Sequence, residues 1–171
     1  MNKFKRTKWK PGTVYGVPLK DGSFGIAQAI DEMMPTVIYV ALFSDRFDTL
    51  PRNSDILIEE NIISLTATWR QDLNNGSWAK IGDLDPVVSK NSFPNEKFAS
   101  SGYVGAFHSD AGLLSDFLSA YHGLEPWNVM YEPDYWEQYL NTNKPKPSSI
   151  LILNSEERST YRKEVLGISD A

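Results

Sequence analysis

The stretch that decides the fold of this 171-residue chain is residues 13–43, which read TVYGVPLKDGSFGIAQAIDEMMPTVIYVALF. Apolar residues flank the pair Asp21 and Gly22, which is typical of the type I′ turn of a β-hairpin. Pro18 cannot donate a hydrogen bond to a neighbouring strand, so we expect the first strand to lie at a sheet edge or to carry a bulge. Residues 37–43 are all apolar, which predicts a strand buried on both faces.

Further strand patterns follow this hairpin. Residues 56–58 and 62–68 are rich in β-branched and apolar side chains, and residues 78–82 alternate after a turn signal at Asn74-Asn75-Gly76. Gly16 and Gly25 favour a sharp bend of the sheet. Residues 83–105 are rich in Pro, Ser, Asn and Gly, which indicates a long irregular connection. We therefore predict a β-rich part over residues 11–88, with a strongly bent antiparallel sheet or a partial barrel.

The remainder of the chain is helical in pattern. Apolar residues on one helical face predict a helix over residues 110–123, with Ser109 or Asp110 as its N-cap and Gly123 at its end. Pro133 in the sequence 132–135 indicates another helix start. We expect a short strand at residues 150–153 and a last helix from Asn154 to Gly167, with Glu157 completing a capping box. The fold class is therefore α+β, a single domain over residues 11–171 whose helix-rich part, residues 108–171, packs on the sheet.

Composition and charge narrow the possible functions. With 41% apolar residues the chain has an ordinary globular composition, which excludes a disordered or collagen-like class, and the absence of Cys excludes disulfides and thiolate chemistry. The formal net charge is −5, but residues 1–10 carry five basic residues and no acidic one, a segment that we expect to form a basic, possibly frayed tail. Between Lys97 and Lys144 there are six acidic residues and no basic one. This asymmetry suggests a charged partner.

The sequence shows no pattern typical of a signal peptide or of a membrane-spanning segment. The basic N-terminus is followed by Trp9-Lys10-Pro11-Gly12 rather than by an apolar signal-peptide core. No run of about 18 apolar residues could span a membrane. We therefore expect a cytoplasmic protein without a membrane partner.

Catalytic and metal motifs are equally scarce. The sequence lacks phosphate-binding glycine loops, an H-E-x-x-H motif and a G-x-S-x-G nucleophile motif. His108 and Asp110 could flank a metal or acid–base site, but Asp110 is more simply a helix cap. Asp83 and Asp85 could pair as carboxylates, although two acids beside Gly82 and Pro86 are typical of a turn. We expect no cofactor, no metal site and no enzymatic activity.

The segment 121–139 combines aromatic and acidic side chains. It holds six aromatic residues, and such a mixture suits a protein interface, a sugar site or a pair of glycosidase carboxylates; alternatively, the aromatic residues pack the helices on the sheet. The candidate partner-binding residues in and near this segment are Asp110, Asp116, Glu125, Trp127, Tyr131, Glu132, Asp134, Trp136 and Glu137.

The first half of the chain resembles a known family. Residues 10–19, the Asp21-Gly22 turn, residues 24–29, the apolar residues 37–43 and Trp78-x-x-Ile81-Gly82 are similar to the immunity protein 26 family of bacterial polymorphic toxin systems. The resemblance covers residues 10–88, about half of the chain. Thr13 stands where that family usually has an acidic residue. Members are predicted antidotes to a toxin encoded beside them, and the family provides no established catalytic residues to transfer.

Three functions from different classes follow. The first is an immunity protein that binds and neutralises a cognate toxin. Its acidic residues would attract a basic face of the toxin, and Trp127 or Trp136 would anchor the complex. The second is a carboxylate-dependent hydrolase acting on a glycan. The third is a nucleic-acid-binding module with residues 3–10 as a basic arm, which is disfavoured because the rest of the chain carries ten more acidic than basic residues.

Overall fold

The structure is a computed structural model that describes residues 4–53, 55–94, 108–141 and 144–169. Five strands form one antiparallel sheet in the order β4-β3-β2-β1-β5. They are β1 (Thr13–Pro18), β2 (Phe24–Met34), β3 (Val37–Phe47), β4 (Ile62–Trp69) and β5 (Ala79–Asp83). The helical elements are α1 (Arg70–Asn74), α3 (Ala111–Tyr121) and α4 (Ser155–Glu164), with 3₁₀ turns η1 (Glu59–Asn61), η2 (Lys90–Ser92) and η3 (Tyr135–Tyr139).

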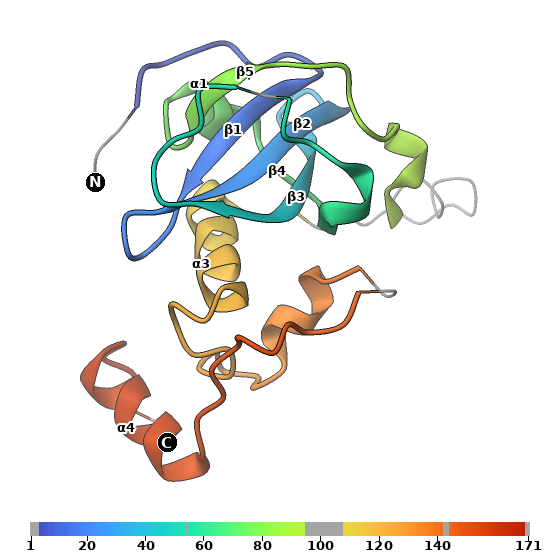
Figure 1. The fold of residues 1–171 in the computed structure, drawn as a ribbon. Coiled ribbons are helices and arrows are strands. Elements are labelled where there is room, and N and C mark those ends of the chain that lie inside the picture. The colour runs from blue at the N-terminus through green and yellow to red at the C-terminus, as the bar shows by residue number, and fades with distance from the viewer. Residues whose placement is uncertain (1–3, 54, 95–107, 142–143, 170–171) are drawn as a thin grey trace.

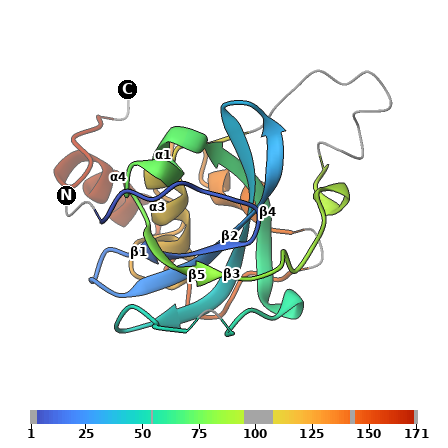
Figure 2. The ribbon, with the colours of Figure 1, turned by 90° about the horizontal axis from the view of Figure 1, so that it is seen from above.

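The predicted α+β class is confirmed. The sheet comes from the N-terminal half, curls without closing into a barrel, and is followed by α3 and α4 in the C-terminal half (Figures 1 and 2). Within the described residues, no helix is long and apolar enough to cross a membrane.

The hairpin of β1 and β2 is confirmed, but its turn is of another type. The Leu19 amide donates to the Ser23 carbonyl (2.9 Å) and the Gly22 amide to the Leu19 carbonyl (3.1 Å). Gly22 has φ of 86°, whereas no described non-glycine residue has a positive φ. A type I′ turn would require a positive φ at Asp21 as well, so that prediction is wrong. The geometry is that of a three-residue loop in which glycine alone takes the left-handed position.

Strand β1 lies inside the sheet rather than at its edge, which corrects one of the two predictions from Pro18. Residues Thr13 to Gly16 pair with β5, with a bulge between Val14 and Tyr15. Pro18 lies beyond that ladder and pairs only with Phe24 of β2. A missing N–H is therefore tolerated at this end of an interior strand.

Both faces of the sheet are covered, as the apolar run 37–43 predicts. Alternate residues of β3 enter two different clusters, with Ile38, Val40 and Leu42 on one face and Tyr39 and Phe43 on the other. Below the sheet in Figure 1, α3 supplies buried side chains to the first cluster, chiefly Leu114, Phe117 and Leu118. The segments that precede η1 and follow β5 cover the second cluster. The sheet is thus the middle layer of the molecule.

Both long helices begin as predicted. The Asp110 carboxylate accepts a hydrogen bond from the Leu113 amide (2.7 Å), and Gly123 follows α3 with φ of 72°. Asn154 and Glu157 form the expected capping box of α4, which ends shortly before Gly167. Local side-chain chemistry therefore determines these boundaries.

Other predicted elements are wrong. Residues 56–58 form no strand, because Ile56 and Leu57 pack over the second cluster instead of pairing. At 150–153 only Leu151 makes an isolated bridge, with Pro126. The predicted helix after Pro133 is the 3₁₀ turn η3, and the sequence analysis did not predict α1.

In the connection predicted for 83–105, residues 84–94 contain η2 as their only 3₁₀ turn, and residues 95–105 lie outside the described residues.

Candidate functional site

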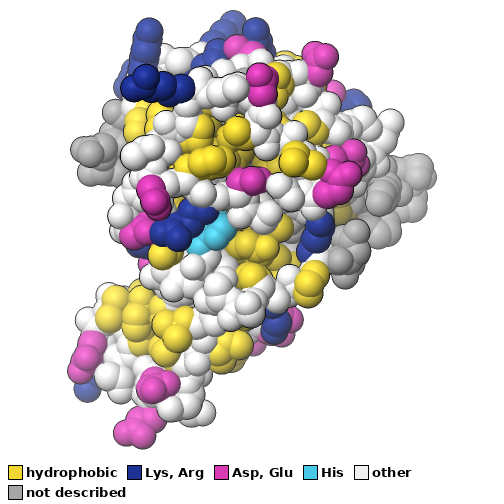
Figure 3. All heavy atoms as spheres, in the orientation of Figure 1, with side chains coloured by type: hydrophobic (Ala, Val, Ile, Leu, Met, Phe, Trp, Pro, Cys, Tyr) yellow, Lys and Arg dark blue, Asp and Glu magenta, His cyan; other side chains and the backbone are white. Residues whose placement is uncertain are grey.

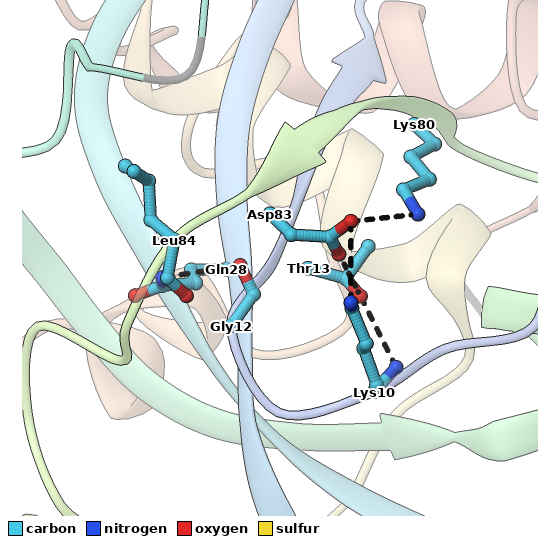
Figure 4. A network of polar contacts seen from close by, with 7 residues as sticks. All are labelled: Lys10, Gly12, Thr13, Gln28, Lys80, Asp83 and Leu84. Carbon is cyan, nitrogen blue, oxygen red and sulfur yellow. Dashed lines mark hydrogen bonds and ion pairs between the residues drawn. The ribbon is translucent and has the colours of Figure 1, made fainter.

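Polar residues at the start of β1 and in β2 contact the end of β5 and the segment that follows it (Figure 4). The fully buried Gln28 donates from Nε2 to the carbonyl oxygens of Gly12 (3.3 Å), Leu84 (3.4 Å) and Asp85 (3.2 Å), and its Oε1 accepts from the Val87 amide (3.0 Å). Gly12 has φ of 96°, and a Cβ there would lie 1.8 Å from the Leu84 carbonyl oxygen. Gly12 and Gln28 therefore have a structural role, because they hold the start of β1 and β2 against the segment that follows β5.

At the same place Asp83 is an ion-pair centre. Its carboxylate accepts from the Thr13 hydroxyl (3.0 Å) and pairs with Lys80 (3.0 Å) and Lys10 (3.6 Å). Burial raises the pKa of Asp83, but the contacts with Lys80 and Thr13 outweigh it and lower the pKa overall. Asp85 is exposed. Asp83 is therefore bound into the structure rather than presented as half of a carboxylate pair.

The basic segment also contacts this end of the sheet. The Phe4 amide donates to the Gly76 carbonyl (2.9 Å) and the Trp9 amide to the Asn74 side chain (2.8 Å). Figures 1 and 2 show the N-terminal segment running beside α1 and the start of β5. The exposed cations Lys5, Arg6 and Lys8 belong to this segment.

Two of the candidate partner-binding residues belong to the core. Trp127 and Trp136 are 1% and 2% exposed. Their ring centroids lie 6.1 Å and 6.0 Å from that of Phe117 in α3. These tryptophans hold the segment that follows α3 against the sheet, so they are not available as surface anchors, and the prediction that they anchor a partner is corrected.

A third candidate, Asp110, acts as a helix cap. Its neighbour His108 packs its ring edge-on against Trp69, with centroids 4.3 Å apart. In the part of the chain that the structure describes, no three His, Asp or Glu side chains gather where they could hold a metal ion.

Asp116 and Glu125 share one lysine. Lys20, in the β1–β2 turn, lies 3.7 Å from the Asp116 carboxylate and 3.2 Å from that of Glu125. Burial raises the pKa of both acids, and Lys20 partly offsets that increase. Burial lowers the pKa of Lys20, but Glu125 and Asp116 raise it overall. This cluster ties the hairpin to α3 and to the chain that leaves α3.

Next to it lies a histidine that sequence patterns do not single out. His122 follows α3, and its Nε2 is buried without a hydrogen-bond partner. Burial lowers its pKa to about 4, and Arg46 adds to the effect. Arg46 forms an ion pair with Asp21. Hydrogen bonds from Ser23, together with this ion pair, lower the pKa of Asp21 to about 2. His122 is thus held neutral beside an ion pair.

The remaining candidates are on the surface. Tyr131 is 84% exposed, and Glu132 and Asp134 are exposed beside it. Glu137 is exposed and pairs with Lys146 at 2.6 Å. Glu125 and Glu137, two of the proposed glycosidase acids, are each paired with a different lysine.

Residues 126–131 connect Tyr131 to the C-terminal part of the chain. The Trp127 amide donates to the Leu151 carbonyl (2.7 Å), and the Asn128 side chain bonds both backbone groups of Leu153 (2.8 and 3.0 Å). From α4, Arg158 donates to the carbonyls of Asn128 (2.6 Å), Met130 (2.6 Å) and Tyr131 (3.0 Å). The buried Arg162 donates to the Val129 carbonyl (2.6 Å). Two arginines therefore fix α4 to this segment through its backbone.

This part of the molecule exposes more large apolar side chains than the rest. Six of the nine large hydrophobic residues that are exposed in the described chain lie between residues 131 and 168. Figure 3 shows hydrophobic side chains gathered on the part of the molecule built around α4. We define the C-terminal surface as these six residues with Glu132 and Asp134; the six are Tyr131, Leu151, Ile152, Val165, Leu166 and Ile168.

Sequence reasoning found Tyr131 and its acids but missed the five aliphatic residues. For Val165, Leu166 and Ile168 the available signal was that they follow the polar helix 155–164, where no core-facing stripe explains them. Leu151 and Ile152 precede that helix, in the stretch predicted as a strand. Comparisons with protein-family models, with curated proteins and with solved structures find no match for this chain.

Proposed function

We propose that this protein binds and neutralises a cognate bacterial toxin, and that the C-terminal surface contacts that toxin. The observation that carries the proposal is the concentration of exposed large apolar residues, beside exposed acids, on the part of the chain held by α4. Such groups are costly to leave in water and are typical of surfaces that a partner covers. The resemblance of residues 10–88 to immunity proteins supports the class of partner.

Charge supports the kind of face that the toxin presents. Glu132 and Asp134 have no ion-pair partner within the described residues, whereas the cations Arg158 and Arg162 are used on backbone carbonyls. An exposed acidic rim beside apolar residues favours a partner with a basic rim around an apolar centre. Tyr131 takes the anchoring role that sequence analysis gave to Trp127 and Trp136, because an exposed tyrosine can bury both a ring and a hydroxyl.

The test is binding to the toxin domain encoded beside this gene, measured by calorimetry with purified proteins. Tyr131→Ala and Ile152→Ser should each weaken binding at least tenfold, because each removes apolar area buried in the complex. Ile58→Ser is the matched control, since Ile58 is 52% exposed and Ile152 is 57% exposed, but Ile58 lies beside η1, away from α4.

The control should bind within a factor of two of the wild type. Equal losses for Ile152→Ser and Ile58→Ser, or unchanged binding in both Tyr131→Ala and Ile152→Ser, would show that the C-terminal surface is not the interface. No detectable binding of the wild-type protein to the neighbouring toxin domain would contradict the proposed function itself.

A further inference from the structure

A cleft of about 710 Å³ lies between α1 and the turn that joins β2 to β3. One of its lining residues is Trp69, which directly precedes α1 and is 40% exposed. The other five described lining residues have polar side chains, namely Thr36, Arg70, Gln71, Asp72 and Asn74. The volume lies within the range of ligand sites, but the lining is more polar than that of a typical apolar pocket.

Backbone contacts hold the walls of this cleft in place. The Arg70 amide donates to the Thr36 carbonyl (2.9 Å), which ties the start of α1 to the β2–β3 turn. The Asp72 carboxylate accepts from the Ala111 amide (2.9 Å), and Leu73 of α1 is buried in the core. The cleft is therefore part of the folded protein and does not need a ligand to form.

The indole ring of Trp69 offers a surface on which a planar group can stack. Trp69 and Tyr131 are the two aromatic residues among the exposed large hydrophobic residues of the described chain. The ring centroids of His108 and Trp69 lie 4.3 Å apart with 79° between the ring planes, so His108 covers at most one face of the indole. An exposed ring in a polar cleft fits a planar ligand with polar edges, such as a nucleobase.

Cations without partners lie beside this cleft. Seven Lys and Arg side chains form neither an ion pair nor a hydrogen bond with another described residue, namely Lys5, Arg6, Lys8, Arg52, Arg70, Lys90 and Lys163. Arg70 lines the cleft, and three others belong to the N-terminal segment, where the Trp9 amide donates to the side chain of the lining residue Asn74 (2.8 Å). Figure 3 shows Lys and Arg side chains at the end of the molecule where Figure 1 places this segment and α1.

The acidic residues in contact with these elements are already used in the fold. Asp72 accepts from the Ala111 amide, and Asp83 pairs with Lys10 and Lys80. The acidic excess of the chain as a whole acts weakly here, because exposed charges more than about 10 Å apart are screened at 0.1 M salt. The four free cations are therefore available to an anionic partner.

A cluster of cations beside an aromatic cleft fits a phosphate chain that carries planar bases. Lysine and arginine neutralise phosphates, and the side-chain amides of Gln71 and Asn74 can reach the edge of a base. A duplex keeps its bases stacked on one another, whereas a single strand can place one against an aromatic ring. The polar lining does not suit a membrane, because surfaces that bind lipid bury an apolar face.

We propose that this end of the protein binds single-stranded nucleic acid, with a base stacked on Trp69 in the cleft and phosphates held by Arg70 and the cations of residues 5–8. This activity is additional to the proposed neutralisation of a toxin, and its residues are not shared with the C-terminal surface.

The test is fluorescence anisotropy of a labelled oligothymidylate of about twelve nucleotides, within the usual site size for a single strand, titrated with the full-length protein. Affinity should fall steeply as salt rises from about 0.02 to 0.2 M, because binding releases counterions from the phosphates. A duplex of the same length should bind more weakly, since its bases cannot reach Trp69.

Two single substitutions test the cleft. Trp69→Ala should weaken binding about tenfold, the effect of one lost stacking contact, whereas Trp69→Phe, which keeps a ring, should stay within about threefold of the wild type. Tyr131→Ala is the matched control, because it removes an exposed aromatic ring elsewhere and should change the affinity less than about twofold. Arg70→Gln should also weaken binding, and it cannot act through folding contacts because the Arg70 side chain is exposed without a described partner.

A triple substitution tests the cations. Replacing Lys5, Arg6 and Lys8 with Gln should reduce the slope of log affinity against log salt by about 2, because each phosphate contact to a single strand contributes about 0.7. The matched control replaces three other exposed, unpaired cations with Gln and should change that slope by less than about 0.5. These control positions are Arg52, Lys90 and Lys163.

Four results would overturn the proposal. The first is no binding of the oligothymidylate at low salt, and the second is an equal affinity of Trp69→Ala, Arg70→Gln and the wild type. The third is an equal salt slope in the two triple variants. The fourth is binding to phosphatidylserine vesicles or to polyglutamate that exceeds binding to the oligothymidylate, which would assign the cations to a membrane or to an acidic protein.

Discussion

Glycine at position 12 is required by both its backbone conformation and its surroundings. Gly12→Ala would place a Cβ 1.8 Å from the Leu84 carbonyl oxygen at a φ of 96°. Gly22 has a similar φ of 86° with nothing within 4 Å of a Cβ, so Gly22→Ala isolates the conformational cost, about 1–2 kcal/mol. We expect Gly12→Ala to lower the free energy of unfolding by at least about 2 kcal/mol more than Gly22→Ala, measured by urea unfolding. Equal losses would contradict the close contact described between Gly12 and Leu84.

His122 predicts a pH dependence of stability. The unfolded chain binds a proton at this residue near pH 6.5, whereas the folded chain does so only near pH 4, because burial lowers the pKa. Between these values the unfolded state binds more protons, so His122 makes stability fall as the pH decreases from about 6.5 to 4. The difference in unfolding free energy between the wild type and His122→Gln should shift against the wild type by up to about 3 kcal/mol over this range. A pH-independent difference would show that the histidine is not held neutral.

At the level of elements, local patterns predicted what local chemistry determines. The capping residues Asp110 and Asn154 identified the starts of α3 and α4, and the apolar run 37–43 identified β3, an interior strand of the sheet. Segments whose structure depends on distant contacts were missed. Residues 56–58 resemble a strand but cover the sheet face. Residues 135–139 form the 3₁₀ turn η3 instead of a helix, and Trp136 and Tyr139 in it pack their rings against Phe117.

The candidate site was predictable only in part for the same reason. Sequence alone cannot separate a buried tryptophan from an exposed tyrosine within one aromatic segment, because both satisfy the same pattern. Trp127 and Trp136 pack on α3, whereas the Tyr131 side chain is exposed and its backbone carbonyl accepts a hydrogen bond from Arg158. The aliphatic residues after α4 were missed because they have no helical period.

The contacts of Lys20 join three elements, and they predict a stability effect. Lys20→Met should lower the free energy of unfolding by about 1 kcal/mol at pH 7, because Asp116 and Glu125 lose their shared cation. The loss should diminish on acidification, because burial raises the pKa of both acids and they lose their charge at a higher pH than exposed carboxyl groups do. Lys8→Met, at an exposed lysine without a described ion pair, is the control and should cost less than about 0.5 kcal/mol. A loss that grows on acidification would contradict this assignment.

At the scale of the whole molecule, the charge distribution makes a kinetic prediction. The exposed acids beside Tyr131 should attract a basic toxin face, so Glu132→Lys should slow association at low ionic strength and change dissociation little. The effect should shrink as salt approaches 0.5 M, because exposed charges are then screened over about a Debye length of a few ångströms. Glu59→Lys, an equal charge reversal in η1, is the control, and stopped-flow kinetics distinguish the two. Equal slowing in both variants would mean that only net charge matters.

Survival of bacteria tests the proposal that this protein neutralises a toxin through the C-terminal surface. Cells would express the toxin domain encoded beside this gene, alone or with the wild-type protein, Ile152→Ser or Ile58→Ser at equal levels. We expect the wild type and Ile58→Ser to restore growth and Ile152→Ser to protect much less. Equal killing with and without the wild-type protein would show that it does not neutralise this toxin.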